Sequence, residues 1–153
     1  VTYHGPGQLV GYPILSLARY CAGPKAYMRL LEEILIRTLA DFDVTAVRRQ
    51  KLTGVWLANE KKIAAMGVRI VRGVTMHGFA LNVSMDLTPF TRIMPCGLAG
   101  CHVTSMAEQL DTPPDMSRVR QRLAGYFAEM FGVEWSDAHP ITSLAAEPAS
   151  IPG

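Results

Sequence analysis

A single stretch decides the class of fold: residues 54–71 read Gly-Val-Trp-Leu-Ala-Asn-Glu-Lys-Lys-Ile-Ala-Ala-Met-Gly-Val-Arg-Ile-Val. Two runs rich in β-branched and other apolar residues, 54–58 and 62–71, lie on either side of Asn59-Glu60. This order predicts two strands joined by a hairpin turn. Residues 44–47 and 78–84 have the same character and predict two further strands. The middle of the chain is therefore predicted to form a β-sheet.

Two long helices are predicted, one before and one after this region. Pro24 suits the first turn of a helix that runs to about residue 42. Its apolar positions follow helical spacing and are expected to face the core; they are Tyr27, Leu31, Ile34, Leu35, Thr38, Leu39 and Phe42. The second helix begins at Asp115 or Ser117 and ends at Gly132. Its four-spaced apolar stripe consists of Val119, Leu123, Phe127 and Phe131.

Shorter elements are predicted elsewhere. Residues 1–4 read as the end of a strand, Gly5-Pro6-Gly7 as a turn, and 9–17 as a second strand. Residues 86–94 are irregular, because two prolines limit any helix there to about a turn. Thr104 or Ser105 is expected to cap a short helix to residue 110, with Glu108 completing a capping box.

These elements predict one α/β (α+β) domain, with a mixed or mostly antiparallel sheet and helices at its flank. Residues 1–136 are assigned to this domain, and residues 137–153, rich in Pro, Ala and Ser, to a flexible C-terminal tail. The chain begins at Val1 in what reads as a strand already in progress. We therefore expect an N-terminal portion of the domain to be missing.

Composition narrows the class of function. A formal charge of +2 and a pI near 8.5 are too mild to indicate nucleic-acid binding. The apolar runs are broken every few residues, so no segment is expected to span a membrane. Cys21, Cys96 and Cys101 form an odd, sparse set that indicates a reducing compartment.

Cys96 is the candidate nucleophile. It stands between Pro95 and Gly97, in a loop where an acyl carbon can reach the sulfur. Cysteine is the most nucleophilic side chain near neutral pH once it is a thiolate. From the local residues alone, a small buried cysteine is the competing interpretation.

Lys62 is the second candidate. Neighbouring residues on a strand face opposite sides, so only one of Lys61 and Lys62 points inward. An inward Lys62 is a cation among apolar residues, for which a thiolate would be a suitable partner. The alternative is a solvated Lys-Lys pair at the start of the strand.

Other motifs are less specific. His77 stands at the mouth of an apolar strand, either as a polar site residue or as a histidine of the core. The glycines at 5 and 7 suit either the close passage of a ligand or a plain turn, and they match no nucleotide-binding fingerprint. Cys96, Cys101 and His102 lack a second ligand pair at zinc spacing, so no metal site is predicted.

The order of these motifs resembles one family. Thr-Tyr-His-Gly-Pro-Gly-Gln-Leu-Val-Gly-Tyr-Pro at 2–13 is followed by Gly-Val-Trp at 54–56 and Lys-Ile-Ala-Ala-Met-Gly-Val-Arg at 62–69. Then come Val-Thr-Met-His-Gly-Phe-Ala-Leu-Asn-Val at 74–83, Pro-Cys-Gly at 95–97 and Val-Thr-Ser at 103–105. The series closely resembles the lipoyl(octanoyl) transferases over most of residues 1–110. The family carries an Arg-Gly-Gly and several strands before the position of Val1, in line with a missing N-terminal portion.

The resemblance implies the fold of the biotin and lipoate protein ligases and a set of site residues. Cys96 falls on the cysteine that carries the acyl thioester, and Lys62 on the lysine that partners it. Three segments fall on those that contact the acyl substrate: Val1, Thr2, Tyr3 and His4; Ala65, Met66 and Gly67; and Gly78, Phe79 and Ala80. We add His77 to this set as the polar residue at the mouth of the apolar strand.

The implied function is transfer of octanoate from acyl carrier protein to a lysine of lipoyl domains, the first step of protein lipoylation. The acceptors would be the lipoyl domains of 2-oxoacid dehydrogenases and the glycine cleavage H protein. No dissociable cofactor or metal is expected, because the donor's phosphopantetheine arm carries the acyl group. A monomer in the cytoplasm is expected, or in mitochondria or plastids for a eukaryotic source.

Two alternatives stay open at this point. The chain could be a non-catalytic module that binds acyl carrier protein or lipoyl domains. It could also be an ATP-dependent lipoate-protein ligase, which is disfavoured by the absence of a phosphate loop and the presence of Cys96.

Overall fold

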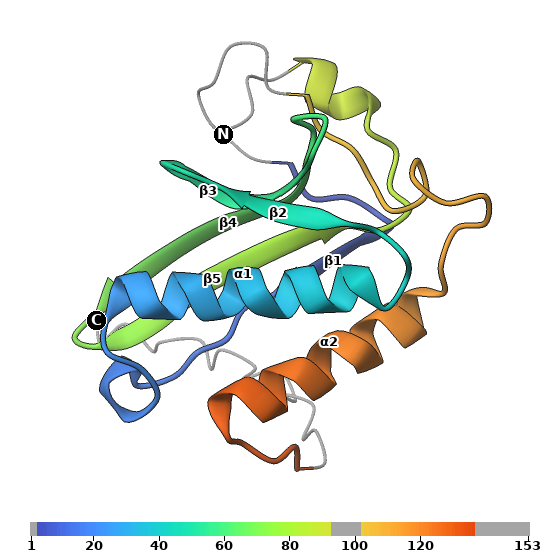
Figure 1. Ribbon diagram of the computed structural model, residues 1–153. Coiled ribbons are helices and arrows are strands. Elements are labelled where there is room, and N and C mark those ends of the chain that lie inside the picture. Colours follow the sequence, from blue (N-terminus) through green and yellow to red (C-terminus); the bar gives the residue numbers. More distant parts are fainter. Residues whose placement is uncertain (1–2, 93–101, 137–153) are drawn as a thin grey trace, which may run out of the picture.

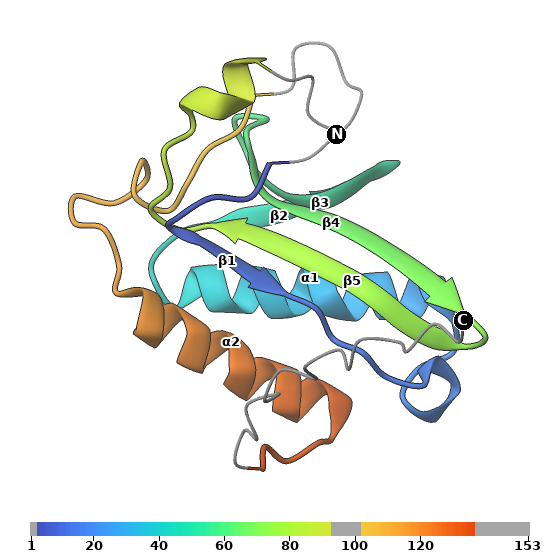
Figure 2. The same cartoon turned by 180° about the vertical axis from the view of Figure 1, so that it is seen from behind.

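The described part of the protein contains one antiparallel sheet with two helices packed on one of its faces (Figures 1 and 2). The structure is a computed structural model that describes residues 3–92 and 102–136. Its strands are β1 (Gln8–Gly11), β2 (Ala46–Arg49), β3 (Leu52–Leu57), β4 (Lys62–Val71) and β5 (Val74–Asn82), in the order β1-β5-β4-β3-β2. The helices are α1 (Pro24–Ala40) and α2 (Met116–Phe131), with 3-10 turns η1 (Leu17–Arg19) and η2 (Thr88–Arg92).

The fold class predicted from the sequence is confirmed. Every strand pair in the described residues is antiparallel. Parallel pairing enters through an isolated bridge between Lys62 and Val103. Strand β4 has the predicted bounds, and the predicted hairpin turn at Asn59-Glu60 separates it from β3.

The two long helices also match the prediction. The buried positions of α1 include Tyr27 and Leu35, and those of α2 are the four residues of the predicted stripe. The Asp115 side chain caps α2 by accepting a hydrogen bond from the Ser117 amide, and Gly132 ends the helix with φ of 61°. Both helices bury their apolar faces against the same face of the sheet, where the core lies.

Three predicted elements near the cavity described below are wrong. Tyr3 and His4 are irregular and not part of a strand; Val1 and Thr2 lie outside the described residues. The strand expected at 9–17 ends at Gly11, shortly before Pro13, which has no amide hydrogen to donate to a ladder. The helix expected at 104–110 is a series of turns.

Long-range hydrogen bonds anchor the start of residues 104–110 to another part of the chain. The Met106 amide donates to the carbonyl of Asn82 at 2.9 Å, and the Ala107 amide donates to that of Val83 at 2.9 Å. These bonds hold the segment against the end of β5. The Ser105 hydroxyl still accepts a hydrogen bond from the Glu108 amide at 3.4 Å, so the predicted cap is used by a turn.

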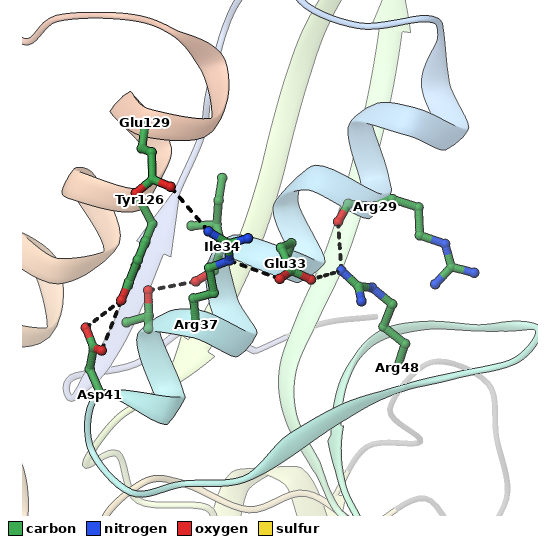
Figure 3. A network of polar contacts seen from close by, with 9 residues as sticks. Arg29, Glu33, Ile34, Arg37, Asp41, Arg48, Tyr126 and Glu129 are labelled. Atoms are coloured by element: carbon green, nitrogen blue, oxygen red, sulfur yellow. Dashed lines mark hydrogen bonds and ion pairs between the residues drawn. The ribbon is translucent and has the colours of Figure 1, made fainter.

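A network of charged side chains ties the outer surfaces of α1 and α2 together (Figure 3). Arg37 forms ion pairs with Glu33 of its own helix and with Glu129 of α2, at 3.0 and 3.3 Å. At the end of α1, Asp41 accepts hydrogen bonds from Arg122 and from the Tyr126 hydroxyl. The hydrogen bonds from Arg122 and Tyr126 lower the pKa of Asp41 below its usual value.

The same network reaches the edge strand β2. Arg48 forms an ion pair with Glu33 and another, at 3.2 Å, with the buried Glu32. Hydrogen bonds from Arg48 and Arg37 lower the pKa of Glu33. No helix in the described residues is long and apolar enough to cross a bilayer.

Candidate functional site

A cavity of about 440 Å³ opens on the sheet and is bounded mainly by the β4–β5 hairpin. It is lined by His4, Gln8, Tyr12, Lys62, Ala65, Met66, Gly67, Val68, Arg69, His77, Gly78, Phe79, Ala80, Asn82, Phe90 and Val103. Most of the residues predicted to contact a substrate are among them. The three parts of the chain that carry the predicted motifs, near residues 4, 65 and 78, thus meet at one place.

Strand pairing explains how two of the predicted segments meet. In the β4–β5 ladder, Ala65 pairs with Ala80, Met66 with Phe79 and Gly67 with Gly78. Residues 65–67 and 78–80 are therefore direct cross-strand neighbours, so their side chains lie in adjacent positions. The hairpin, and not a loop, holds this part of the cavity wall.

Gly78 brings β1 close to the wall of the cavity. A Cβ atom on residue 78 would lie 2.2 Å from the carbonyl oxygen of Gly11, far inside any permitted contact. Only glycine allows this approach of the two backbones. The neighbouring His77 has a positive φ of 62°, is exposed, and lies edge-on to Tyr12 with ring centroids 5.9 Å apart. Its interpretation as a core histidine is therefore wrong.

Lys62 points inward and its side chain is buried, with a residue exposure of 4%. It is the first residue of β4, and its backbone pairs with residues 102–104 through a parallel bridge to Val103. The Lys62 amide donates to the carbonyl of His102 at 2.8 Å, and the Thr104 amide donates to that of Lys62 at 2.9 Å. Residues 102–104 are thus fixed beside this lysine.

The Lys62 ammonium lies against an aromatic ring. Its Nζ atom is 5.0 Å from the ring centroid of Trp56, its cross-strand partner in β3. An ammonium at this distance is attracted by the electrons of the ring face. The interaction holds the ammonium group at the cavity wall.

The proposed nucleophile, Cys96, lies outside the described residues, as do Val1 and Thr2. Tyr3 is described but does not line the cavity. Its ring packs edge-on against Phe90, which does, with ring centroids 5.7 Å apart. Tyr3 therefore supports Phe90 in the cavity wall.

His4 lines the cavity and is connected to other residues there by a chain of hydrogen bonds. Its Nδ1 atom lies 2.7 Å from Oε1 of Gln8, and Nε2 of Gln8 donates to Oδ1 of Asn82 at 2.9 Å. The Nδ2 atom of the buried Asn82 donates to the carbonyl of Thr104 at 2.9 Å. This chain connects the N-terminal segment, strand β5 and the segment beside Lys62.

Sequence analysis missed Gln8, Asn82, Tyr12 and Phe90 as cavity residues. Asn82 carried a usable signal, because it is a polar residue inside an apolar strand, and a buried polar group needs partners. Gln8 and Tyr12 stand in the motif at 2–13 but were given no role there, and Phe90 carried no signal, since only the tertiary fold brings it to the hairpin.

Basic residues near the site are mostly engaged elsewhere. Arg48 and Arg49 form ion pairs with glutamates of α1 and of the β3–β4 turn. Arg69 lines the cavity. The described residues contain no group of three His, Cys, Asp or Glu side chains that could hold a metal ion.

Comparison with known proteins identifies a family. The model of the lipoyl protein ligase A/B catalytic domain matches residues 1–128. An octanoyltransferase of Geotalea uraniireducens (strain Rf4) is 53% identical over 127 residues, which cover 83% of this chain and 59% of the relative. An octanoyltransferase of Solibacter usitatus (strain Ellin6076) is 52% identical over 146 residues, covering 95% of this chain and 64% of the relative. The chain spans less than two thirds of the length of these relatives.

Solved structures show the same fold. A bi-partite lipoate protein ligase from Thermoplasma acidophilum, studied with its E2 lipoyl domain, superposes with a TM-score of 0.69 at 19% identity, covering 89% of this chain and 56% of the other. The biotin protein ligase of Aquifex aeolicus superposes with a TM-score of 0.62 at 15% identity, covering 82% and 53%.

Proposed function

The chain belongs to the lipoyl protein ligase A/B catalytic domain family, and on this premise we propose that it transfers an octanoyl group from acyl carrier protein to a lysine of a lipoyl domain. The observation that carries the proposal is the buried Lys62 at the wall of the cavity formed by the β4–β5 hairpin. The identity of about 50% to octanoyltransferases supports the choice of reaction.

The cavity suits an acyl chain. Ala65, Gly67 and Ala80 leave room because their side chains are small or absent, and Met66 and Phe79 supply apolar surface. Burial of an octanoyl tail there removes apolar surface from water. The polar groups, Lys62 and the His4–Gln8–Asn82 chain, also line it, and they would face the reacting end of the substrate.

The reaction has two steps. The Cys96 thiolate, favoured by the positive charge of Lys62, attacks the octanoyl thioester of the carrier's phosphopantetheine arm and expels the arm as a thiolate, which takes a proton from solvent. The octanoyl group is then bound to Cys96. A lysine amine of the acceptor attacks this thioester and forms an amide. Cys96 is released as a thiolate. Backbone amides near Gly78 or Gly97 would bind the developing oxyanion.

The proposal includes the partners of both steps. The donor is octanoyl-acyl carrier protein, and the acceptors are lipoyl domains of 2-oxoacid dehydrogenases and the glycine cleavage H protein. The relative from Thermoplasma acidophilum, described with an E2 lipoyl domain, supports a lipoyl domain as acceptor. The chemistry needs no dissociable cofactor, and we place a monomeric protein in the cytoplasm.

Intact mass spectrometry after incubation with octanoyl-acyl carrier protein tests the proposal. We expect an adduct of about 126 Da, mapped to Cys96 and removed by hydroxylamine. Cys96→Ser should give no such labile adduct and no transfer. Full transfer by this variant would rule out the thioester route.

Two further measurements on the same protein distinguish the transferase from the two alternatives. A protein that binds octanoyl-acyl carrier protein without an adduct on Cys96 would be a binding module. Transfer of free octanoate or lipoate that requires ATP would identify a ligase, to which the Thermoplasma relative belongs by description.

A further inference from the structure

The hydrogen-bonded chain between His4 and Thr104 has a fixed direction. It ends on the backbone carbonyl of Thr104, which can only accept a hydrogen bond. The Asn82 amide must therefore present its NH₂ group to this carbonyl and its Oδ1 atom to Gln8. With an exposure of 5%, Asn82 is buried, so reversing its amide would leave two buried polar groups without partners.

Gln8 transmits this direction to His4. Its Nε2 group faces Oδ1 of Asn82 at 2.9 Å and the carbonyl of Tyr3 at 3.5 Å, and both of these atoms are acceptors. The Oε1 atom of Gln8 is therefore the atom that faces His4, at 2.7 Å from Nδ1. Because Oε1 only accepts, Nδ1 of His4 carries the hydrogen.

The neutral imidazole of His4 is thus held in the tautomer whose Nε2 atom has a free lone pair. No described residue forms a hydrogen bond with this Nε2 atom, and His4 lines the same cavity as Lys62. The carbonyl of Thr104 thus selects the tautomer of His4 through the side-chain amides of Asn82 and Gln8. A histidine that merely filled space would not need this arrangement.

We propose that His4 is the general base of the second step, in which the acceptor lysine attacks the octanoyl thioester. This inference rests on the proposed function. The amine nitrogen forms a bond to the thioester carbon, and His4 Nε2 takes the proton that the nitrogen must lose. The carbon–sulfur bond breaks, and its electron pair leaves with the Cys96 sulfur as a thiolate. The His4 imidazolium then passes its proton to solvent, which restores the starting state.

Lys62 is poorly suited to this proton transfer. In the proposed first step it acts as a cation beside the thiolate, and an ammonium has no lone pair to accept a proton. Assigning the base to His4 leaves Lys62 with one charge state throughout the reaction.

His4→Asn provides the first test, because an asparagine amide can still donate to Gln8 but has no basic nitrogen. The octanoyl-enzyme is formed first, and its reaction with a lipoyl domain is then followed in a single turnover. We expect amide formation to slow by about 100-fold, well beyond any change in the rate at which the adduct forms. Hydroxylamine should remove the acyl group from both proteins equally, which shows that the variant thioester is intact.

Gln8→Glu provides a second test that a purely structural role would not pass. A carboxylate still accepts the Nδ1 hydrogen, and its negative charge favours the protonated imidazole. We therefore expect the pH midpoint of amide formation to move upward by more than that of acylation.

The outcomes separate the two proposals. Absence of an adduct on the unchanged protein would overturn the proposed function itself. An adduct together with unchanged amide formation in His4→Asn would overturn the role of His4 alone. If His4→Asn does not fold, judged by circular dichroism, an unmoved pH midpoint in Gln8→Glu would overturn that role instead.

Discussion

Gly54 and Lys62 lie so close together that a Cβ atom on residue 54 would be 2.6 Å from Cε of Lys62 and 3.3 Å from its Nζ atom. The same Cβ would be 2.6 Å from the carbonyl oxygen of Ala64. Gly54 has φ of 115°, and the β3–β4 register shifts just after it, between Val55 and Trp56. The missing side chain at residue 54 therefore provides the space in which the lysine reaches the Trp56 ring.

Gly54→Ala should displace the Lys62 ammonium as well as strain the backbone. We expect the free energy of unfolding to fall by roughly 1–3 kcal/mol, measured by urea denaturation. We also expect alkylation of Cys96 by iodoacetamide to need a higher pH, because the cation proposed to favour the thiolate has moved.

Gly23→Ala is the matched control for this change. Gly23 has φ of 116°, almost the value of Gly54, but an added Cβ there has no heavy atom within 4 Å. It should reproduce the backbone strain and leave Cys96 alkylation unchanged. If the two variants alkylate alike, Gly54 has no role in placing Lys62.

Lys62→Ala should slow octanoyl transfer and shift the alkylation profile of Cys96 upward, with a rate at neutral pH lower by about tenfold. The reaction is followed by mass spectrometry with each cysteine mapped. Cys21, which is half-buried near η1, serves as an internal reference whose profile should stay the same. Lys61→Ala removes a neighbouring charge that is less buried and should have little effect. An unchanged Cys96 profile in Lys62→Ala would refute the role of the lysine as charge partner.

How much could be predicted depended on whether the signal was local. The α1 and α2 cores and β4 were predictable, because periodicity and caps within each segment determine them. The place of residues 104–110 in the fold was not, because Met106 and Ala107 bind the distant end of β5. The same holds for the site: Lys62 was identified through a motif, whereas the Gln8–Asn82 contact joins residues 74 positions apart.

The lowered pKa of Asp41 predicts a stability that depends on pH. Because the hydrogen bonds from Arg122 and Tyr126 favour the charged carboxylate in the folded state, their contribution is present above the unfolded-state pKa. It is lost as the pH falls through the folded value, below about pH 4. Asp41→Asn should lower the free energy of unfolding by about 1 kcal/mol or less at neutral pH, since the pair is exposed. The difference from the unchanged protein should vanish in acid; a difference that persists at pH 2 would contradict this linkage.

Ala80 should help to set the length of the acyl chain. It lines the cavity beside Ala65, its cross-strand neighbour in β4, and both side chains are small. Ala80→Leu would fill space that the octanoyl tail needs under the proposed function, at a cost in stability of about 1–3 kcal/mol from overpacking. Offered an equimolar mixture of hexanoyl-, octanoyl- and decanoyl-acyl carrier protein, the variant should form more of the hexanoyl adduct and less of the longer ones, as read from intact masses. Ala40→Leu, on the exposed end of α1, should keep the original preference. An unaltered adduct distribution in a folded Ala80→Leu protein would mean that the tail lies elsewhere, because a leucine at this position cannot share the same space with it.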